Sequence, residues 1–183
     1  MASSIDQFKK TEAQSIRHIT ITLPVSFTAF TDAFEAKLGR ISMSLFRNSK
    51  SFHDYETATA EVNGGEPFAI SNNYNHGYLA TIRNQDIGEG KKRVGKRYDF
   101  GNVLFASSMT VHDIRAGQYA PLTMLVWEAK EGETVCQWDS AEDLMGKGTE
   151  GNPEVVKVAE MLDRERETVV MEAFETATGK EKL

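Results

Sequence analysis

Four residues in three separate segments carry side chains suited to small-molecule chemistry. They are His76, Tyr78, Asn102 and Tyr119. Histidine titrates near neutral pH, so His76 is the best candidate for a general acid or base. Asn102 and Tyr119 can orient a ligand or stabilise an oxyanion, and Tyr78 adds an aromatic surface with a hydroxyl group. An apolar pocket with a few polar groups of this kind is typical of small-molecule sites.

Each of these residues also has an ordinary structural explanation. Gly101-Asn102 follows an aromatic run at 98–100, and this pattern is typical of a sharp connection between a strand and a helix. Tyr119 suits a packed core, and His76 suits a polar turn that it stabilises by hydrogen bonding. The sequence therefore favours a structural role for these residues, and a role at the rim of a pocket is the second interpretation.

Other catalytic and metal-binding patterns are missing from the sequence. The four histidines have no paired spacing that would place two metal ligands on one helical face, so we expect no metal site. Cys136 lies within a predicted strand and is expected to be an inert, buried thiol. There is no Gly-x-Ser-x-Gly motif, the nucleophile turn of one large class of hydrolases. We expect no cofactor.

The basic segment GKKRVGKR, residues 90–97, resembles part of a phosphate-binding loop. It departs from that motif at Arg97, where Ser or Thr would hold magnesium, and no apolar strand leads into it. We interpret the segment as a solvated loop. Its positive charge leaves open an attraction for an anionic substrate or partner.

The composition is that of a folded globular chain. Of its 183 residues, 40% are hydrophobic and 26% are charged, which is enough to build one core. The net charge of −6 and the pI near 5.3 argue against a partner with a phosphate backbone. No stretch reaches the ~18 apolar residues of a membrane span, and no signal-peptide pattern is present. We expect a cytoplasmic protein with neither nucleic-acid nor membrane partners.

Hydrophobic periodicity predicts the elements of the first half. Residues 17–23 alternate in polarity as a half-buried strand does, with His18 on the polar face. Residues 26–38 have apolar positions at steps of three and four, which predicts an amphipathic helix that Ser26 caps and Gly39 ends. Residues 53–65 are compatible with a helix. Residues 67–83 are rich in Asn and aromatic residues and favour one or two strands with a polar turn.

The second half contains a predicted hairpin and a long helix. Residues 122–127 and 134–138 flank a charged turn, and the first of these strands is apolar enough to be covered on both faces. Residues 138–145 end in a short helical turn. From Pro153 onward, an apolar stripe predicts a long C-terminal helix packed on a sheet. Arg166 falls on the same stripe, so the helix is expected to kink, end or reach the edge of the domain there.

These elements predict an α+β fold, with a mixed or antiparallel sheet packed against helices and a long C-terminal helix. We place one domain at residues 17–178, between a flexible leader at 1–16 and a flexible tail at 179–183.

Several short motifs occur in an order that resembles the domain-of-unknown-function 302 family. They are NHGYLATIR (75–83), FGNVLFASSM (100–109), AGQYAPLTMLVWE (116–128) and WDSAEDLM (138–145). The resemblance covers roughly residues 17–175 and implies a compact α+β fold that is often dimeric, with no established activity. Two positions depart from the family's pattern: Asn75 stands where Asp is usual, and Val103 stands where Pro is usual.

Three functions from different classes fit the sequence. The first is a small-molecule-binding domain with an apolar and aromatic pocket, in which Tyr78, Asn102 and Tyr119 contact the ligand. The second is an enzyme that uses His76 in general acid–base chemistry on a small organic substrate. The third is a structural or interaction module that acts as a homodimer. The sequence favours the first of these and does not identify the ligand.

Overall fold

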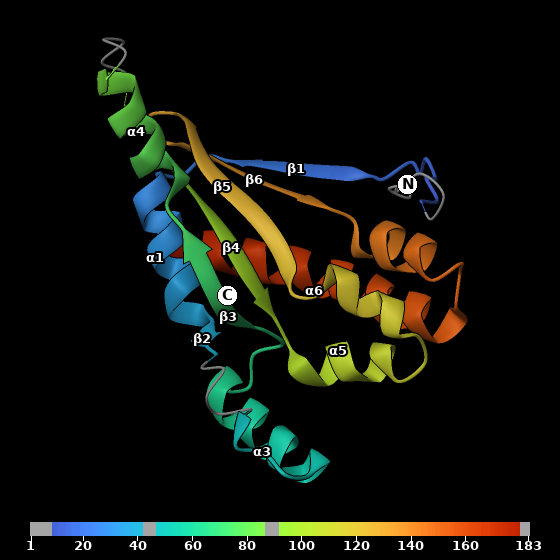
Figure 1. The fold of residues 1–183 in the computed structure, drawn as a ribbon. Helices are drawn as coiled ribbons and strands as arrows, with labels where there is room; N and C mark the ends of the chain where they lie inside the picture. The colour runs from blue at the N-terminus through green and yellow to red at the C-terminus, as the bar shows by residue number, and fades with distance from the viewer. Residues whose placement is uncertain (1–8, 42–46, 87–91, 180–183) are drawn as a thin grey trace.

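The computed structural model describes residues 9–41, 47–86 and 92–179. Its strands and helices, in chain order, are β1 (His18–Leu23), α1 (Phe27–Lys37), β2 (Gly39–Arg40), α3 (Phe52–Asn63), β3 (Ala69–Tyr74), α4 (His76–Asp86), β4 (Gly95–Gly101), α5 (Val103–Thr110), the 3-10 helix η2 (Ile114–Tyr119), β5 (Leu122–Lys130), β6 (Glu133–Asp139), the π-helical turn η3 (Glu142–Gly146) and α6 (Pro153–Thr178). The predicted α+β class is confirmed (Figure 1).

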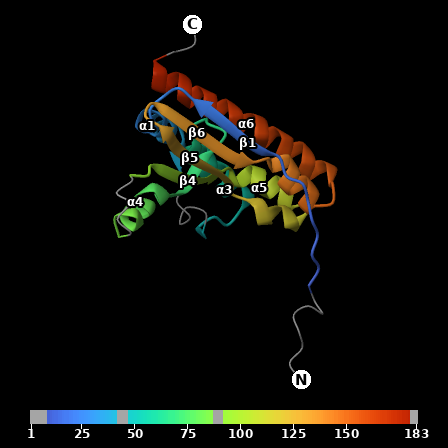
Figure 2. The same cartoon turned by 90° about the horizontal axis from the view of Figure 1, so that it is seen from above.

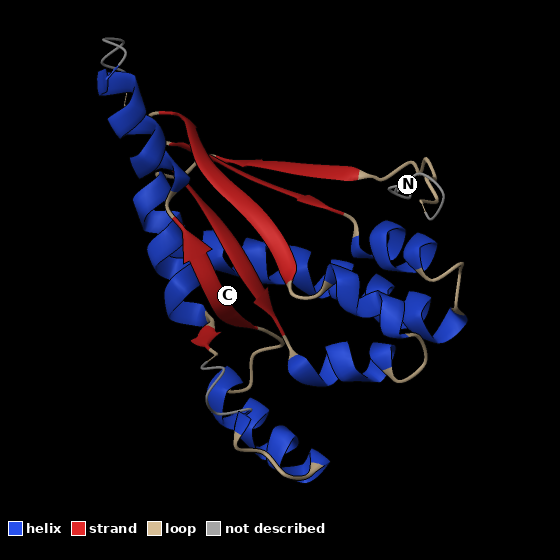
Figure 3. Cartoon of the chain, in the orientation of Figure 1, coloured by secondary structure: helices blue, strands red, loops and turns tan. Residues whose placement is uncertain are grey.

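The six strands form one sheet in the order β1-β6-β5-β4-β3-β2. The short β2 runs parallel to β3, and the other neighbours are antiparallel, so the sheet is mixed, as predicted. Helices α1 and α6 pack on one face of the sheet, whereas α3 lies beyond its β2 edge and contacts β2 and α5 (Figures 2 and 3). The hydrophobic core fills the layer between these two helices and the sheet.

Helix α1 forms as its sequence predicts and supplies aromatic side chains to the core. The Ser26 side chain accepts a hydrogen bond from the backbone of Ala29, which caps the helix. The helix ends at Lys37, and Gly39 starts β2. Phe30 and Phe34 are fully buried and pack toward the aromatic residues of β4.

Strand β4 is joined to α1 by a charged pair at the edge of the core. Glu35 accepts hydrogen bonds from Lys96 Nζ at 2.8 Å and from the Tyr98 hydroxyl at 2.7 Å. Burial disfavours its charge, but these two donors outweigh burial and lower the pKa of Glu35. Residues 95–97 therefore belong to a strand, and the prediction of a solvated loop is wrong for them. Residues 90 and 91 lie outside the described part of the chain.

The long C-terminal helix is confirmed. The Asn152 side chain caps it and Pro153 occupies its first turn, while Gly179 ends it with a left-handed backbone. The apolar stripe, which includes Val155, Leu162 and Val169, is buried. Arg166 is buried on the same stripe, and the helix continues through it to Thr178.

Two predictions for the strands need correction. Residues 76–83 lie in helix α4 and not in a second strand, and the backbone of Gly77 in this helix packs closely against Gly95 at the start of β4. The predicted hairpin of β5 and β6 is present, but β5 is not covered on both faces. Thr123 is exposed and Leu125 is only half-buried, so the helices cover one face of this strand alone.

The described structure has no helix or strand in residues 9–17, and α6 ends at Thr178. Residues 1–8 and 180–183 lie outside it, so the flexible leader and tail stay predictions from the sequence. No helix in the described ranges is long and apolar enough to cross a membrane.

Candidate functional site

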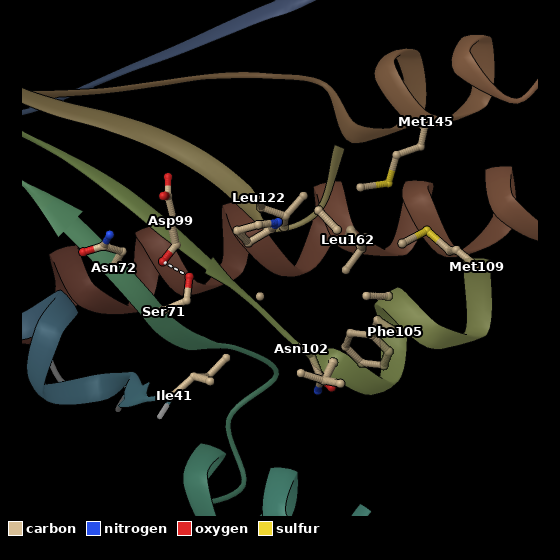
Figure 4. Close-up of a pocket in the computed structure, with 15 residues that line it drawn as sticks. Ile41, Ser71, Asn72, Asp99, Asn102, Phe105, Met109, Leu122, Met145 and Leu162 are labelled. Carbon is tan, nitrogen blue, oxygen red and sulfur yellow. Dashed lines mark hydrogen bonds between the residues drawn. The ribbon is translucent and has the colours of Figure 1, made fainter. Parts of the chain in front are cut away.

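An apolar cavity of about 430 Å³ opens below the sheet, at the end where β4 leads into α5 (Figure 4). Its walls come from β3, β4, α5, the start of β5, η3 and α6. The large apolar side chains that line it are Ile41, Phe105, Met109, Leu122, Met145 and Leu162. Polar groups are few and come mainly from Ser71, Asn72, Asp99 and Asn102. The cavity thus combines apolar walls with a polar margin along β3 and β4.

Asn102 fixes the position of α5, which forms one wall of the cavity. Its side-chain oxygen accepts a hydrogen bond from Leu104 N at 2.9 Å and thereby caps the helix. Its side-chain nitrogen donates to the carbonyl of Pro67 at 3.0 Å. The connection from strand to helix predicted for Gly101-Asn102 is therefore confirmed, and Asn102 also lines the cavity.

On the polar margin, one carboxylate oxygen of Asp99 is buried and accepts no hydrogen bond from the described residues. Ser71 donates to the backbone oxygen of Asp99 at 3.0 Å, and Asn72 is bonded to its neighbours on β3. Asp99 Oδ1 lies 3.1 Å from Arg97 Nη2 as an ion pair. The geometry of this pair is not that of a hydrogen bond, and Oδ1 is buried without a hydrogen-bond donor among the described residues. A ligand hydroxyl or amine could supply that donor.

A second cavity of about 330 Å³ adjoins the first and is more polar. It lies in a fork of the sheet: pairing between β5 and β6 begins at Leu125 and Gln137, so the strand segment 122–124 has no partner on β6 (Figure 1). Asp99, Leu122 and Met145 belong to the walls of both cavities, together with the cis-linked pair Ala120–Pro121. The two cavities therefore share a boundary.

Arg166 of α6 lines the second cavity and is 1% exposed. Its Nη2 atom donates to Asp163 at 2.6 Å and to the backbone oxygen of Asp139 at 2.9 Å. Its guanidinium carbon lies 5.1 Å from the centre of the Trp138 ring. Burial lowers the pKa of Arg166, and the negative charge of Asp163 opposes that effect. Its Nε atom is buried with no hydrogen-bond partner in the described structure.

The structure does not bring the four residues singled out in the sequence into one cavity. Asn102 lines the apolar cavity, and Tyr119 lines the polar one. His76 and Tyr78 line neither, because α4 starts beside Gly95 whereas Asn102 follows the other end of β4. A strand of this length separates its ends by roughly 20 Å. The catalytic role of His76 and the ligand contacts of Tyr78, Asn102 and Tyr119 stay predictions.

The first turn of α4 explains what Asn75 and its neighbours do in the fold. The Asn75 side chain accepts a hydrogen bond from Tyr78 N at 2.8 Å, which an Asp side chain would also do. The His76 ring lies near that of Tyr74, with 6.3 Å between their centres. Tyr78 is 63% exposed.

Sequence reasoning missed Asp99, Leu162 and Arg166 as site residues. Leu162 lies on the apolar stripe of the C-terminal helix, which the sequence predicts to pack on the sheet, and in the structure it also borders the apolar cavity. The one available signal for Arg166 was its place on an otherwise apolar stripe, since a charged residue is seldom buried without a partner. No such signal marked Asp99.

Other chemistry finds little support in the described ranges. They contain no cluster of three or more His, Cys, Asp or Glu side chains that could hold a metal ion. Cys136 is buried in β6 as expected, and burial raises the pKa of its thiol, so little of the reactive thiolate forms near neutral pH.

The fold and its two adjoining cavities define an α+β domain with a mixed six-stranded sheet, covered by helices on one face. The chain belongs to the DUF302 family, because the family model for "Domain of unknown function DUF302" matches residues 43–169, well over half of its length. The resemblance seen in the sequence is thereby confirmed.

A solved structure has a similar fold. It is the crystal structure of an uncharacterized conserved DUF302 protein from Bacillus stearothermophilus, with a TM-score of 0.56 and 13% sequence identity. The match covers 85% of this chain and 97% of that chain. At this level of identity the likeness shows the fold alone. No curated protein matches the sequence.

Proposed function

We propose that this protein binds a small, largely apolar organic molecule in the apolar cavity between α5 and the sheet. The observation that carries the proposal is the cavity itself, whose volume of about 430 Å³ lies within the usual range of ligand sites, roughly 300–1,000 Å³. Well-packed cores rarely leave empty spaces larger than a water molecule. Other concavities of the described structure have similar volumes, and this one differs from them in its lining of large apolar side chains next to the core, which is typical of a ligand site.

The distribution of polar groups supports this function. Apolar side chains from α5, β5, η3 and α6 would contact the body of the ligand, and burial of its apolar surface would drive binding. Asp99 Oδ1, buried without a donor, would accept a hydrogen bond from a polar substituent. The apolar walls would supply affinity, and the polar margin would orient the ligand.

The other functions stay predictions from the sequence. Catalysis at His76 draws no support from its position, since His76 lines neither cavity. A cytoplasmic location and self-association likewise stay predictions.

Ala106→Phe is expected to weaken binding of a neutral apolar probe. Ala106 lies on α5 and lines the cavity, so a phenyl ring at this position would occupy part of the ligand's space. The measurement is a fluorescence titration with phenylnaphthylamine, which should bind the wild type saturably at one site. We expect the variant to lose at least about tenfold in affinity, or about 1.4 kcal/mol.

Ala60→Phe is the matched control, because Ala60 is an exposed alanine on α3. It should bind the probe as the wild type does. Thermal melts of both variants establish that they are folded, since overpacking at a filled site costs about 1–3 kcal/mol. Equal affinity in wild type and Ala106→Phe would contradict the proposal, as would the absence of saturable binding across a panel of neutral aromatic and aliphatic probes.

A further inference from the structure

We propose that the polar cavity in the fork between β5 and β6 recognises a carboxylate, so that the ligand is an amphipathic organic acid. The apolar body of this ligand would lie in the apolar cavity between α5 and the sheet, and its carboxylate would reach Arg166 in the polar cavity. This inference rests on the proposed function, because it assigns the charged end of the same ligand. The two cavities share a boundary at Asp99, Pro121 and Leu122, so one molecule can contact both.

The first step of the argument is the incomplete hydrogen bonding of Arg166. Its side chain is 2% exposed, and both hydrogen bonds described for it are donated by Nη2. Nε is buried with no partner. A guanidinium group has five N–H donors arranged as a planar fork that matches a carboxylate. A buried donor left unpaired is costly, so this arrangement favours an acceptor that arrives with the ligand.

The second step concerns Asp163, which does not fully satisfy Arg166. Asp163 also accepts hydrogen bonds from the Ser140 hydroxyl at 2.8 Å, from Ala141 N at 2.8 Å and from Glu142 N at 3.1 Å. Its charge is therefore shared among four donors, three of which hold the start of η3. Asp163 positions Arg166 and leaves Nε without a partner.

The third step concerns the other charges of this cavity. Its two carboxylates each have a cationic or titratable partner: Arg97 lies 3.1 Å from Asp99, and His18 is hydrogen bonded to Asp139. Arg97 lies at the cavity wall as a second cation, and Gln118, Tyr119 and Thr123 add neutral polar groups. Both acids thus have a cationic or titratable neighbour, and Asp99 Oδ1 still accepts no hydrogen bond within the described part of the chain. Arg166 is the buried cation with remaining donor capacity, and a carboxylate complements it.

The test compares a carboxylic acid with its uncharged amide of the same shape. Naphthoate and naphthamide are titrated against the wild type, Arg166→Met and Arg164→Met. We expect the wild type to bind naphthoate at least about tenfold more tightly than naphthamide, the size expected of charge-assisted hydrogen bonds. Arg166→Met should remove this preference, because it should weaken binding of naphthoate much more than that of naphthamide, whose carbonyl is a neutral and weaker acceptor. Asp163 keeps three donors in this variant, and Met retains much of the volume.

Arg164→Met is the matched control, since Arg164 is exposed on the same helix. It should keep the preference for the acid. If Arg166→Met does not fold, the NMR signal of the Arg166 Nε–H group in the wild type decides, because naphthoate, as the charged acceptor, should shift it clearly further than naphthamide does.

The outcomes separate this inference from the proposed function. If the wild type binds acid and amide equally and Ala106→Phe weakens both, the inference is overturned and the proposed function stands. An acid preference that persists in Arg166→Met overturns the inference as well. If neither compound binds although phenylnaphthylamine does, the inference is overturned and the proposed function stands; if no neutral apolar probe binds saturably either, both are overturned.

Discussion

Phe34→Ala is expected to lower the free energy of unfolding by about 3–5 kcal/mol, the usual cost of removing a buried phenyl ring. Phe34 is 0% exposed and lies at the centre of an aromatic cluster. Its ring centre lies 5.2 Å from that of Tyr98 and 5.8 Å from that of Phe100, both in edge-to-face geometry. Loss of this ring would separate α1 from β4. Equilibrium denaturation in urea measures the effect.

Phe52→Ala is the matched control for this prediction. Phe52 begins α3 and is 59% exposed, so its removal should change stability by less than about 0.5 kcal/mol. A cost below about 1 kcal/mol for Phe34→Ala would show that α1 does not pack on the sheet as the structure has it.

Leu162→Ala is expected to cost about 2–5 kcal/mol and to enlarge the apolar cavity. Leu162 is 3% exposed, belongs to the core and borders the cavity. Removing its side chain leaves space that is continuous with the existing cavity. The variant should therefore be less stable and should favour phenylnaphthylamine over the smaller naphthalene more strongly than the wild type does.

Leu79→Ala gives the comparison for this variant, because Leu79 is 62% exposed on α4 and lines neither cavity. It should affect neither stability nor the ratio of the two affinities. If Leu162→Ala were as stable as the wild type, α6 would not be part of the core. If the ratio of the affinities for phenylnaphthylamine and naphthalene were unchanged in Leu162→Ala, the probe would bind outside the apolar cavity.

Elements with a regular hydrophobic period could be predicted from the sequence. Residues 17–23 alternate and form β1, residues 26–38 repeat at three and four and form α1, and the stripe after Pro153 forms α6. In these segments local pattern and tertiary packing agree. Residues 76–83 have no strong apolar stripe that would predict a helix, and in the structure Gly77 lies in close contact with Gly95. That contact joins segments distant in the sequence, so no local pattern predicts it.

The site was less predictable than the fold for the same reason. Asn102 could be found because its turn chemistry is local, and the structure places it at the cavity. The cavity also depends on Ile41, Asp99 and Leu162, which come from three distant segments. The unpaired Nε of Arg166 depends on the fork between β5 and β6, and strand register of this kind follows from tertiary packing. His76 resembled a site residue only through its chemical type.

The most direct measurement of the central claim is a methyl NMR titration with protein labelled at its methionine methyl groups. Met109 and Met145 line the apolar cavity, whereas Met171 is 40% exposed on α6 and lines neither cavity. Saturating phenylnaphthylamine should shift the signals of Met109 and Met145 and leave that of Met171 in place. Saturable binding with a shift confined to Met171, or with no shift at Met109 and Met145, would contradict a ligand site in this cavity.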